Sequence, residues 1–311
     1  MTNDISNDLF HPLVWEQAWA NDSFTAVKQM KAAGIDPAHS FDTKAVSFNK
    51  DVFSAEGQQR TTRILNWIQG QGVPFENASI LDIGAASGGF SIPFAQRGGI
   101  VTSVEPCVPL QQLLQENADR MASGKVTIVP EEFQDIDVAA KGWNQAFDLV
   151  FVSMCPVIYD WPSVEKVLQC ASQFCYISST AGPRENSLVN EVLPLVSEDN
   201  QPIQHHGSDM GYLLHLLYLK GYAYESIVTH EMKTVEMSKH DALQHVMMIL
   251  HLHQVNIRAD AKQLISDYLD QQYPSGIVSI QEGGRFGKVL IRLQDRSMYT
   301  MEVPANISTQ S

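Results

Sequence analysis

One short stretch of this chain constrains its fold more than any other. Residues 80–92 read Ile-Leu-Asp-Ile-Gly-Ala-Ala-Ser-Gly-Gly-Phe-Ser-Ile, an apolar run followed by a glycine-rich turn and the start of a helical segment. Glycines in such a turn permit positive φ and remove side chains that would hold a ligand away from the backbone. The free N–H groups at the start of the helix can bind an anionic or polar group. The stretch therefore predicts a strand, a ligand-binding turn and a helix of one α/β unit.

Residues 79–180 alternate between β-rich runs and helical stretches, an order typical of a parallel sheet with crossover helices. The strands expected here are 79–83, 100–105, 125–129, 147–153 and 173–180. Residues 183–207 are polar and show no pattern, a helix is expected at 209–220, and two later strands are expected at 224–237 and 288–293. The predicted fold class is α/β, with a doubly wound, mostly parallel seven-stranded sheet of the Rossmann-like type.

The same patterns predict how the chain is divided. Residues 1–75 contain helical runs closed by Gly34, Pro37 and Gly70, and they are expected to form an N-terminal helical cap or lid. Residues 76–296 form the expected ligand-binding domain, with a helical insertion at about 239–272. Residues 297–311 form a polar tail.

Composition limits the possible partners. Lys and Arg number 21 against 35 Asp and Glu, a formal charge of -14, which disfavours binding to nucleic acid. With four cysteines and no Cys-x-x-Cys pair, the chain signals neither a disulfide framework nor a zinc ribbon. His240 and His245 do not share one helix face, so no metal is expected. No signal peptide and no apolar run of about 18 residues is present, so a cytoplasmic protein without membrane contact is expected.

Two acidic residues follow strands that neighbour the glycine-rich turn. Glu105 ends the second expected strand, where a carboxylate can accept hydrogen bonds from both hydroxyls of a ribose. Glu132 and Phe133 follow the third, where a carboxylate can accept from an adenine amine and an aromatic ring can lie on the base. Because the carboxyl ends of parallel strands meet at one edge of the sheet, these residues together predict an adenosine site.

These residues resemble the class I methyltransferases that use S-adenosylmethionine. Residues 81–90 are similar to the first motif of that family, residues 147–154 to its fourth, and residues 41–48 to a stretch that closes over the methionine part of the cofactor. Ala86 stands where the family motif has glycine. The resemblance covers residues 41–234 and implies S-adenosylmethionine as cofactor, bound by Lys44, Phe48, Asp82, Gly84, Ala85, Ala86, Ser87, Gly88, Glu105, Pro106, Glu132, Phe133, Ser153, Met154 and Cys155.

The resemblance also implies a reaction. We expect direct in-line methyl transfer to a small-molecule acceptor, which needs alignment and exclusion of water rather than a catalytic triad. No catalytic residue is fixed by the sequence; Tyr159, Asp160, His205 and His206 are the candidates. An RNA acceptor is disfavoured by the charge, and a protein acceptor stays open.

Two other functions remain as alternatives. An NAD-dependent oxidoreductase shares the strand, the turn and the acid, but the glycine spacing here (Gly84, Gly88, Gly89) differs from Gly-x-Gly-x-x-Gly. A non-catalytic module that binds S-adenosylmethionine would need the same residues as the enzyme.

Overall fold

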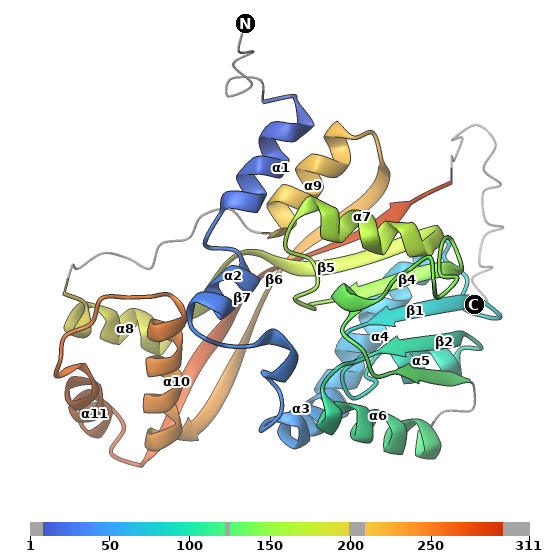
Figure 1. Cartoon of the computed structure of the whole chain (residues 1–311). Helices are drawn as coiled ribbons and strands as arrows, with labels where there is room; N and C mark the ends of the chain where they lie inside the picture. Colours follow the sequence, from blue (N-terminus) through green and yellow to red (C-terminus); the bar gives the residue numbers. More distant parts are fainter. Residues whose placement is uncertain (1–8, 122–124, 199–208, 295–311) are drawn as a thin grey trace, which may run out of the picture.

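A seven-stranded sheet forms the centre of the computed structural model, which describes residues 9–121, 125–198 and 209–294 (Figure 1). The strands lie in the order β3-β2-β1-β4-β5-β7-β6. They are β1 (Ser79–Ile83), β2 (Ile100–Val104), β3 (Val126–Val129), β4 (Phe147–Ser153), β5 (Ala171–Asn186), β6 (Ala223–Ser238) and β7 (Ile277–Arg292). Strands β1 to β5 pair in parallel, and β7 is antiparallel to both β5 and β6. The predicted doubly wound, mostly parallel α/β sheet is confirmed.

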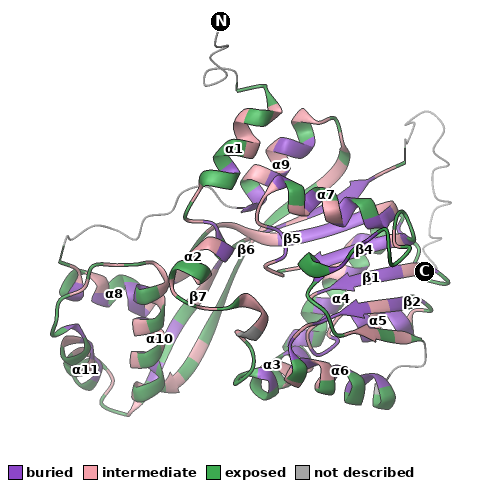
Figure 2. Cartoon of the chain, viewed as in Figure 1, coloured by how far each residue is buried: buried purple, intermediate pink, exposed green. Residues whose placement is uncertain are grey.

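Helices cover both faces of this sheet, which explains why its central strands are apolar almost without interruption. One core joins the sheet to α1 (Pro12–Asn21), α7 (Trp161–Cys170) and α9 (Asp209–Leu219). A second core, on the other face, joins it to α4 (Ala55–Gly70) and α5 (Ser91–Gln96). Helix α6 (Val108–Met121) and the short 3-10 helix η3 (Phe133–Asp135) complete this part of the chain. Figure 2 shows the central strands buried between the two helical layers.

Three strands continue well past the others. Strand β5 pairs with β4 as far as Ser178, which lies opposite Ser153, and then runs on to Asn186 beside β7. Residues 179–186, 228–238 and 277–287 of β5, β6 and β7 thus project beyond the carboxyl edge of the sheet. Helices α8 (Ser187–Val196), α10 (Lys239–Leu252) and α11 (Ala261–Gln272) pack on this projection around a separate core. We call these strand segments and helices the arm (Figure 1).

Part of the arm differs from the sequence-based expectation. Residues 183–207 were expected to be irregular, but residues 183–186 extend β5 and residues 187–196 form α8. Proline at position 194, inside α8, hides the helical pattern. Strand β7 begins at Ile277, whereas it was expected to begin at Lys288. The sequence pattern does not show the first part of the strand, because Gly283, Gly284 and Gly287 interrupt it. A Cβ on Gly283 would lie 1.9 Å from the carbonyl oxygen of Glu231. Glycine there permits β7 to approach β6 closely.

The N-terminal segment contacts α9, then α10 of the arm, and then α6. Helix α1 packs on α9, and the buried Trp19 donates a hydrogen bond from Nε1 to Oδ1 of Asp209 (2.8 Å). Helix α2 (Ala26–Ala32) lies against α10 and is followed by the 3-10 helix η2 (Pro37–His39). Helix α3 (Ala45–Val52) then packs against α6. Among the described helices, none has the length and apolar character needed to cross a membrane.

Candidate functional site

The glycine-rich turn after β1 has an unusual backbone. Gly84, Ala86 and Gly88 have φ angles of 73°, 48° and 91°, in the left-handed region that favours glycine. The turn is also tightly packed: a Cβ on Gly84 would lie 2.3 Å from Sγ of Cys155, and one on Gly88 would lie 2.5 Å from Cδ1 of Leu114. Ala86 therefore carries a side chain where the backbone conformation disfavours one, a form of strain that concentrates at functional sites.

Glu105, at the end of β2, is buried and bonded to this turn. Its Oε2 accepts a hydrogen bond from the N–H of Ala86 (2.8 Å), and its Oε1 accepts one from the N–H of Cys107 (2.9 Å). Burial raises the pKa of Glu105, and these two hydrogen bonds oppose that shift. An ionised carboxylate has about four acceptor sites, so about two remain for the hydroxyls of a ligand.

Asp82, on β1 before the turn, is hydrogen-bonded to the helix that follows the turn. The hydroxyl of Ser91 donates to Oδ2 of Asp82 (2.5 Å) and accepts from the hydroxyl of Ser103 (2.8 Å), so this buried chain joins β1, α5 and β2. Burial raises the pKa of Asp82 to about 7; the hydrogen bond from Ser91 opposes the shift and the charge of Glu105 adds to it. Asp82 thus joins the strand before the turn to the helix after it.

Ser87 shows a property expected of a binding site. Its side chain is fully buried, and its Oγ has no hydrogen-bond partner in the described part of the chain. Buried polar groups normally have partners, so an unpartnered one in a tight turn fits a site completed by a bound molecule. Together with the positive-φ turn and the anchored Glu105, the residues fit the methionine and ribose portions of S-adenosylmethionine.

Helix α3, part of the segment predicted to act as a lid, covers the turn. A Cβ on Gly89 would lie 2.5 Å from Cγ1 of Val52, so this helix lies directly on the turn. The amide of Asn117 in α6 donates to Oδ1 of Asn49 (2.8 Å) and to the carbonyl oxygen of Ser87 (3.0 Å). One buried amide therefore connects the lid to the turn.

Phe48 and Lys44 were predicted to bind the cofactor from the lid. Phe48 lies on α3, and Lys44 lies at its start. Phe48 packs beside the small cluster of Ala45, Cys107 and Leu110, with its ring centroid 4.9 Å from that of Phe41. Lys44 is the exposed residue immediately before the helix.

The two residues expected to contact adenine, Glu132 and Phe133, differ in their exposure. Glu132 is exposed and precedes η3, at the end of β3. Phe133 is only 4% exposed and belongs to the main core, with Nζ of Lys166 5.3 Å from its ring centroid. Its ring consequently presents little surface to a base, so Glu132 is the better placed of the two to contact adenine.

The end of β4 brings together several predicted residues. The hydroxyl of Ser153 shares a hydrogen bond with that of Ser178 on β5 (3.1 Å). Met154 has a φ of 53° and is 49% exposed. Burial raises the pKa of Cys155 to about 12, with smaller contributions from the charges of Glu105 and Asp82, while a backbone hydrogen bond opposes the shift. The thiol is therefore protonated at neutral pH and is a poor nucleophile.

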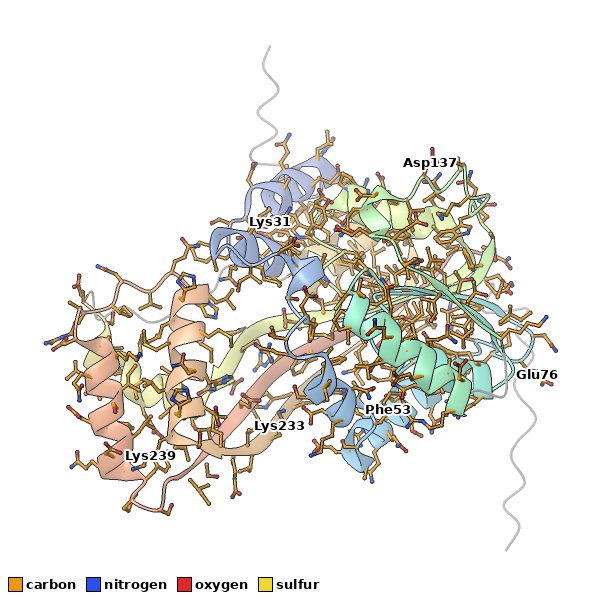
Figure 3. All side chains as sticks on the ribbon, turned by 60° about the horizontal axis from the view of Figure 1, so that its bottom comes forward. Lys31, Phe53, Glu76, Asp137, Lys233 and Lys239 are labelled. Atoms are coloured by element: carbon orange, nitrogen blue, oxygen red, sulfur yellow. The ribbon has the colours of Figure 1, made fainter. Side chains whose placement is uncertain are left out.

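Of the four candidate catalytic residues, the structure describes Asp160 and Tyr159. Asp160 accepts a hydrogen bond from the N–H of Ser163 (2.9 Å) in a capping box at the start of α7, which is a structural role. Tyr159 lies beneath Nζ of Lys31, at 5.7 Å from the ring centroid; Lys31 is labelled on α2 in Figure 3. His205 and His206 lie outside the described residues.

Sequence reasoning did not identify Asn117, Asn49 or Ser178 as parts of the site. A signal for Asn117 exists: it falls on the stripe of α6 that carries the buried Leu110 and Leu114. A polar residue on an apolar stripe indicates a buried hydrogen bond. For Ser178, which joins the site through a pairing between strands, the sequence offers no such signal.

Comparisons with known proteins found partial similarities. No family model matches the chain. The 23S rRNA (uracil(1939)-C(5))-methyltransferase RlmD of Pectobacterium atrosepticum is 33% identical over 102 residues, which are 32% of this chain and 22% of RlmD. The chain thus matches about a fifth of the length of this relative. Two similar solved structures are magnesium protoporphyrin IX methyltransferase (ChlM) of Synechocystis PCC 6803 with bound SAM (15% identity, 70% and 89% of the two chains, TM-score 0.39) and YcgJ of Bacillus subtilis (12%, 74% and 97%, 0.45).

The comparison with RlmD corrects one prediction. We expected a small-molecule acceptor and no nucleic acid, and the similarity to a ribosomal RNA methyltransferase contradicts this expectation. Nucleic acid had been disfavoured because of the net charge of the whole chain. That charge does not fix the local charge at the site, where Lys44 is exposed beside the lid and Lys31 lies over Tyr159.

Proposed function

We propose that this chain, which has the fold of class I methyltransferases, transfers a methyl group from S-adenosylmethionine. The observation that carries the proposal is the turn after β1: a left-handed backbone at three positions, the carboxylate of Glu105 bonded to it, and the unpartnered buried hydroxyl of Ser87. In this proposal the turn and Ser87 hold the methionine portion, and Glu105 binds the ribose. Glu132 contacts the adenine.

The protein's own residues then have two tasks, to exclude water and to border the acceptor. The cofactor, when bound, supplies an activated methyl group, so no strong base is required for an acceptor that is already nucleophilic. Helix α3, tied to the turn by Asn117, excludes water from the reacting atoms. Ser153 and Met154, at the end of β4, border the acceptor. Burial, together with neighbouring charges, raises the pKa of Cys107 to about 11 and that of Cys155 to about 12, which favours direct transfer over a covalent intermediate on either thiol.

The acceptor is the finer part of the proposal. The name of the matched relative supports RNA, and the exposed cation Lys44 beside the lid is of the sign that phosphate requires. The expected result is that labelled methyl groups enter the RNA fraction of a cell extract.

Two measurements test the proposal in sequence. Calorimetry with S-adenosylmethionine, S-adenosylhomocysteine and NAD should show binding of the first two in the micromolar range; binding of NAD alone would replace the methyltransferase by the oxidoreductase alternative. Labelled S-adenosylmethionine is then incubated with extract, and the RNA and small-molecule fractions are counted separately, with Glu105→Ala as the control that lacks the ribose ligand. Cofactor binding without any labelled product would instead support the non-catalytic module.

A further inference from the structure

The carboxyl edge of the sheet continues from the cofactor turn into the arm. The register places Ile83 opposite Val152 and Ser153 opposite Ser178, so Gly84 and these two serines lie at one level. Ser178 lies in turn opposite Lys288 on β7. Neighbouring strands are about 4.8 Å apart, so the Cα atom of Lys288 lies about 10 Å from that of Ser153. Residues at the base of the arm are therefore close to the place where the methyl group is transferred.

Lys288 is an almost buried cation at this position. Its side chain is 13% exposed, and its Nζ donates to Oγ1 of Thr229 (2.8 Å) and to Oε1 of Glu231 (3.2 Å). An ammonium group has three N–H donors, and the third has no partner among the residues that the structure describes. Burial alone would raise the pKa of Glu231, but the hydrogen bonds from Thr229 and Lys288 and the charges of Lys288 and Arg63 lower it. The ionised carboxylate thus holds Lys288 in place.

Tyr176 is a second buried donor. Its side chain is fully buried, and its Oη lies within reach of the hydroxyl of Ser178, although the two form no hydrogen bond of ordinary geometry. Alternate residues of a strand share a face, so Tyr176, Ser178 and, across the strand pair, Lys288 lie on one face of the sheet. Tyr176 is diagonal to Lys288, a relation of about 7–8 Å that long side chains span. Glu231 and Ser178 are close enough to act on the hydroxyl: burial raises the pKa of Tyr176, Ser178 opposes the shift and the charge of Glu231 adds to it.

The donors favour one kind of ligand atom. Lys288 can only donate, and the hydroxyls of Tyr176 and Ser178 can do so. Donors that converge beside a methyl donor select an oxygen with full or partial negative charge. The next residue of β7 on this face, Phe286, is half-buried and offers aromatic surface for the body of a flat ligand.

We propose that Lys288, with Tyr176 and Ser178, binds a carbonyl or anionic oxygen of the methyl acceptor and so determines acceptor specificity. This inference rests on the proposed methyltransferase function. It makes the base of the arm, where β5 and β7 leave the rest of the sheet, the part of the molecule that recognises the acceptor, whereas the turn after β1 holds the cofactor.

The test compares Lys288→Met with Lys288→Arg and with a matched control, Arg285→Met. Arg285 is exposed on the same strand and, three residues away, lies on the opposite face of the sheet. Each variant is assayed for transfer of labelled methyl groups to limiting extract, with the RNA and small-molecule fractions counted separately. Calorimetry with S-adenosylhomocysteine and the melting temperature are measured in parallel.

The expected results separate recognition from a structural role. Lys288→Met should lower the initial rate at limiting acceptor about tenfold or more, with the affinity for S-adenosylhomocysteine within about twofold of the wild type. Lys288→Arg should recover most of that rate, Arg285→Met should match the wild type, and Tyr176→Phe should lower the rate by about threefold to tenfold. The labelled fraction distinguishes an oxygen of RNA from one of a small molecule.

Three outcomes would overturn the inference. Wild-type rates in Lys288→Met would refute it and leave the methyltransferase proposal standing. The same refutation follows if the rate falls only in proportion to a lower melting temperature, or equally in Arg285→Met. Absence of labelled product from the wild-type protein, with cofactor bound, would refute the proposed function and this inference together.

Discussion

Replacing Ala86 by glycine should reverse the usual effect of that substitution. In most positions an alanine-to-glycine change destabilises a protein, because glycine loses more backbone freedom on folding, at a cost of about 0.5–1 kcal/mol. Ala86 has a φ of 48°, however, and a left-handed conformation costs a residue with a Cβ about 1–2 kcal/mol. Glycine removes this cost.

The expected net effect is small and, over most of its range, of opposite sign to the usual one. The methyl group of Ala86 is half-buried beside the cluster of Ala45, Cys107 and Leu110, so its loss removes only part of the roughly 0.8 kcal/mol of a buried methylene. The sum ranges from a loss of a few tenths of a kcal/mol to a gain of about 1 kcal/mol. Ala85 is the matched control: it is buried, lies outside the left-handed region and gains no relief, so Ala85→Gly should cost about 1.5 kcal/mol.

Thermal unfolding followed by circular dichroism measures this difference. One kcal/mol shifts the melting temperature by about 2–4 °C in domains of 150–250 residues, so the two variants should differ by about 2–10 °C, with Ala86→Gly the more stable. The affinity for S-adenosylhomocysteine should stay within about threefold of the wild type, because glycine keeps the backbone N–H that donates a hydrogen bond to Glu105. If Ala86→Gly lowers the melting temperature as much as Ala85→Gly does, the argument from backbone strain is wrong.

Two further predictions concern buried carboxylates. Glu105→Ala should weaken binding of S-adenosylmethionine by about 1.5–3 kcal/mol, measured by calorimetry, because charge-assisted hydrogen bonds to the ribose are lost; a change of a few tenths would contradict the ribose assignment. Burial raises the pKa of Asp82 from 3.8 to about 7, so the folded protein binds the additional proton. The stability contributed by Asp82 is therefore complete below about pH 4 and is lost as pH rises to about 7. Denaturant titrations from pH 4 to 8 should show this decline in the wild type and a flatter profile in Asp82→Asn; equal slopes would exclude the buried proton.

Local pattern predicted the core of the fold well. The strands from β1 to β4 and the turn after β1 depend on short apolar runs, glycines and strand-end acids, and these signals are contained in the sequence itself. The position of Glu105 at the edge of the sheet followed from the same order of elements. The prediction of Phe133 as a surface for adenine was less successful, since the sequence does not show which face of a short segment is buried, and the ring lies in the main core.

The sequence by itself therefore determined the class of fold, the glycine-rich turn after β1 and the acid beside it, because each depends on residues that are close in the chain. Only the tertiary structure decided the arm, the left-handed backbone of Ala86, and the position of Lys288 opposite Ser178. These features depend on strand pairings between distant segments, whose register arises from packing in three dimensions rather than from any local period.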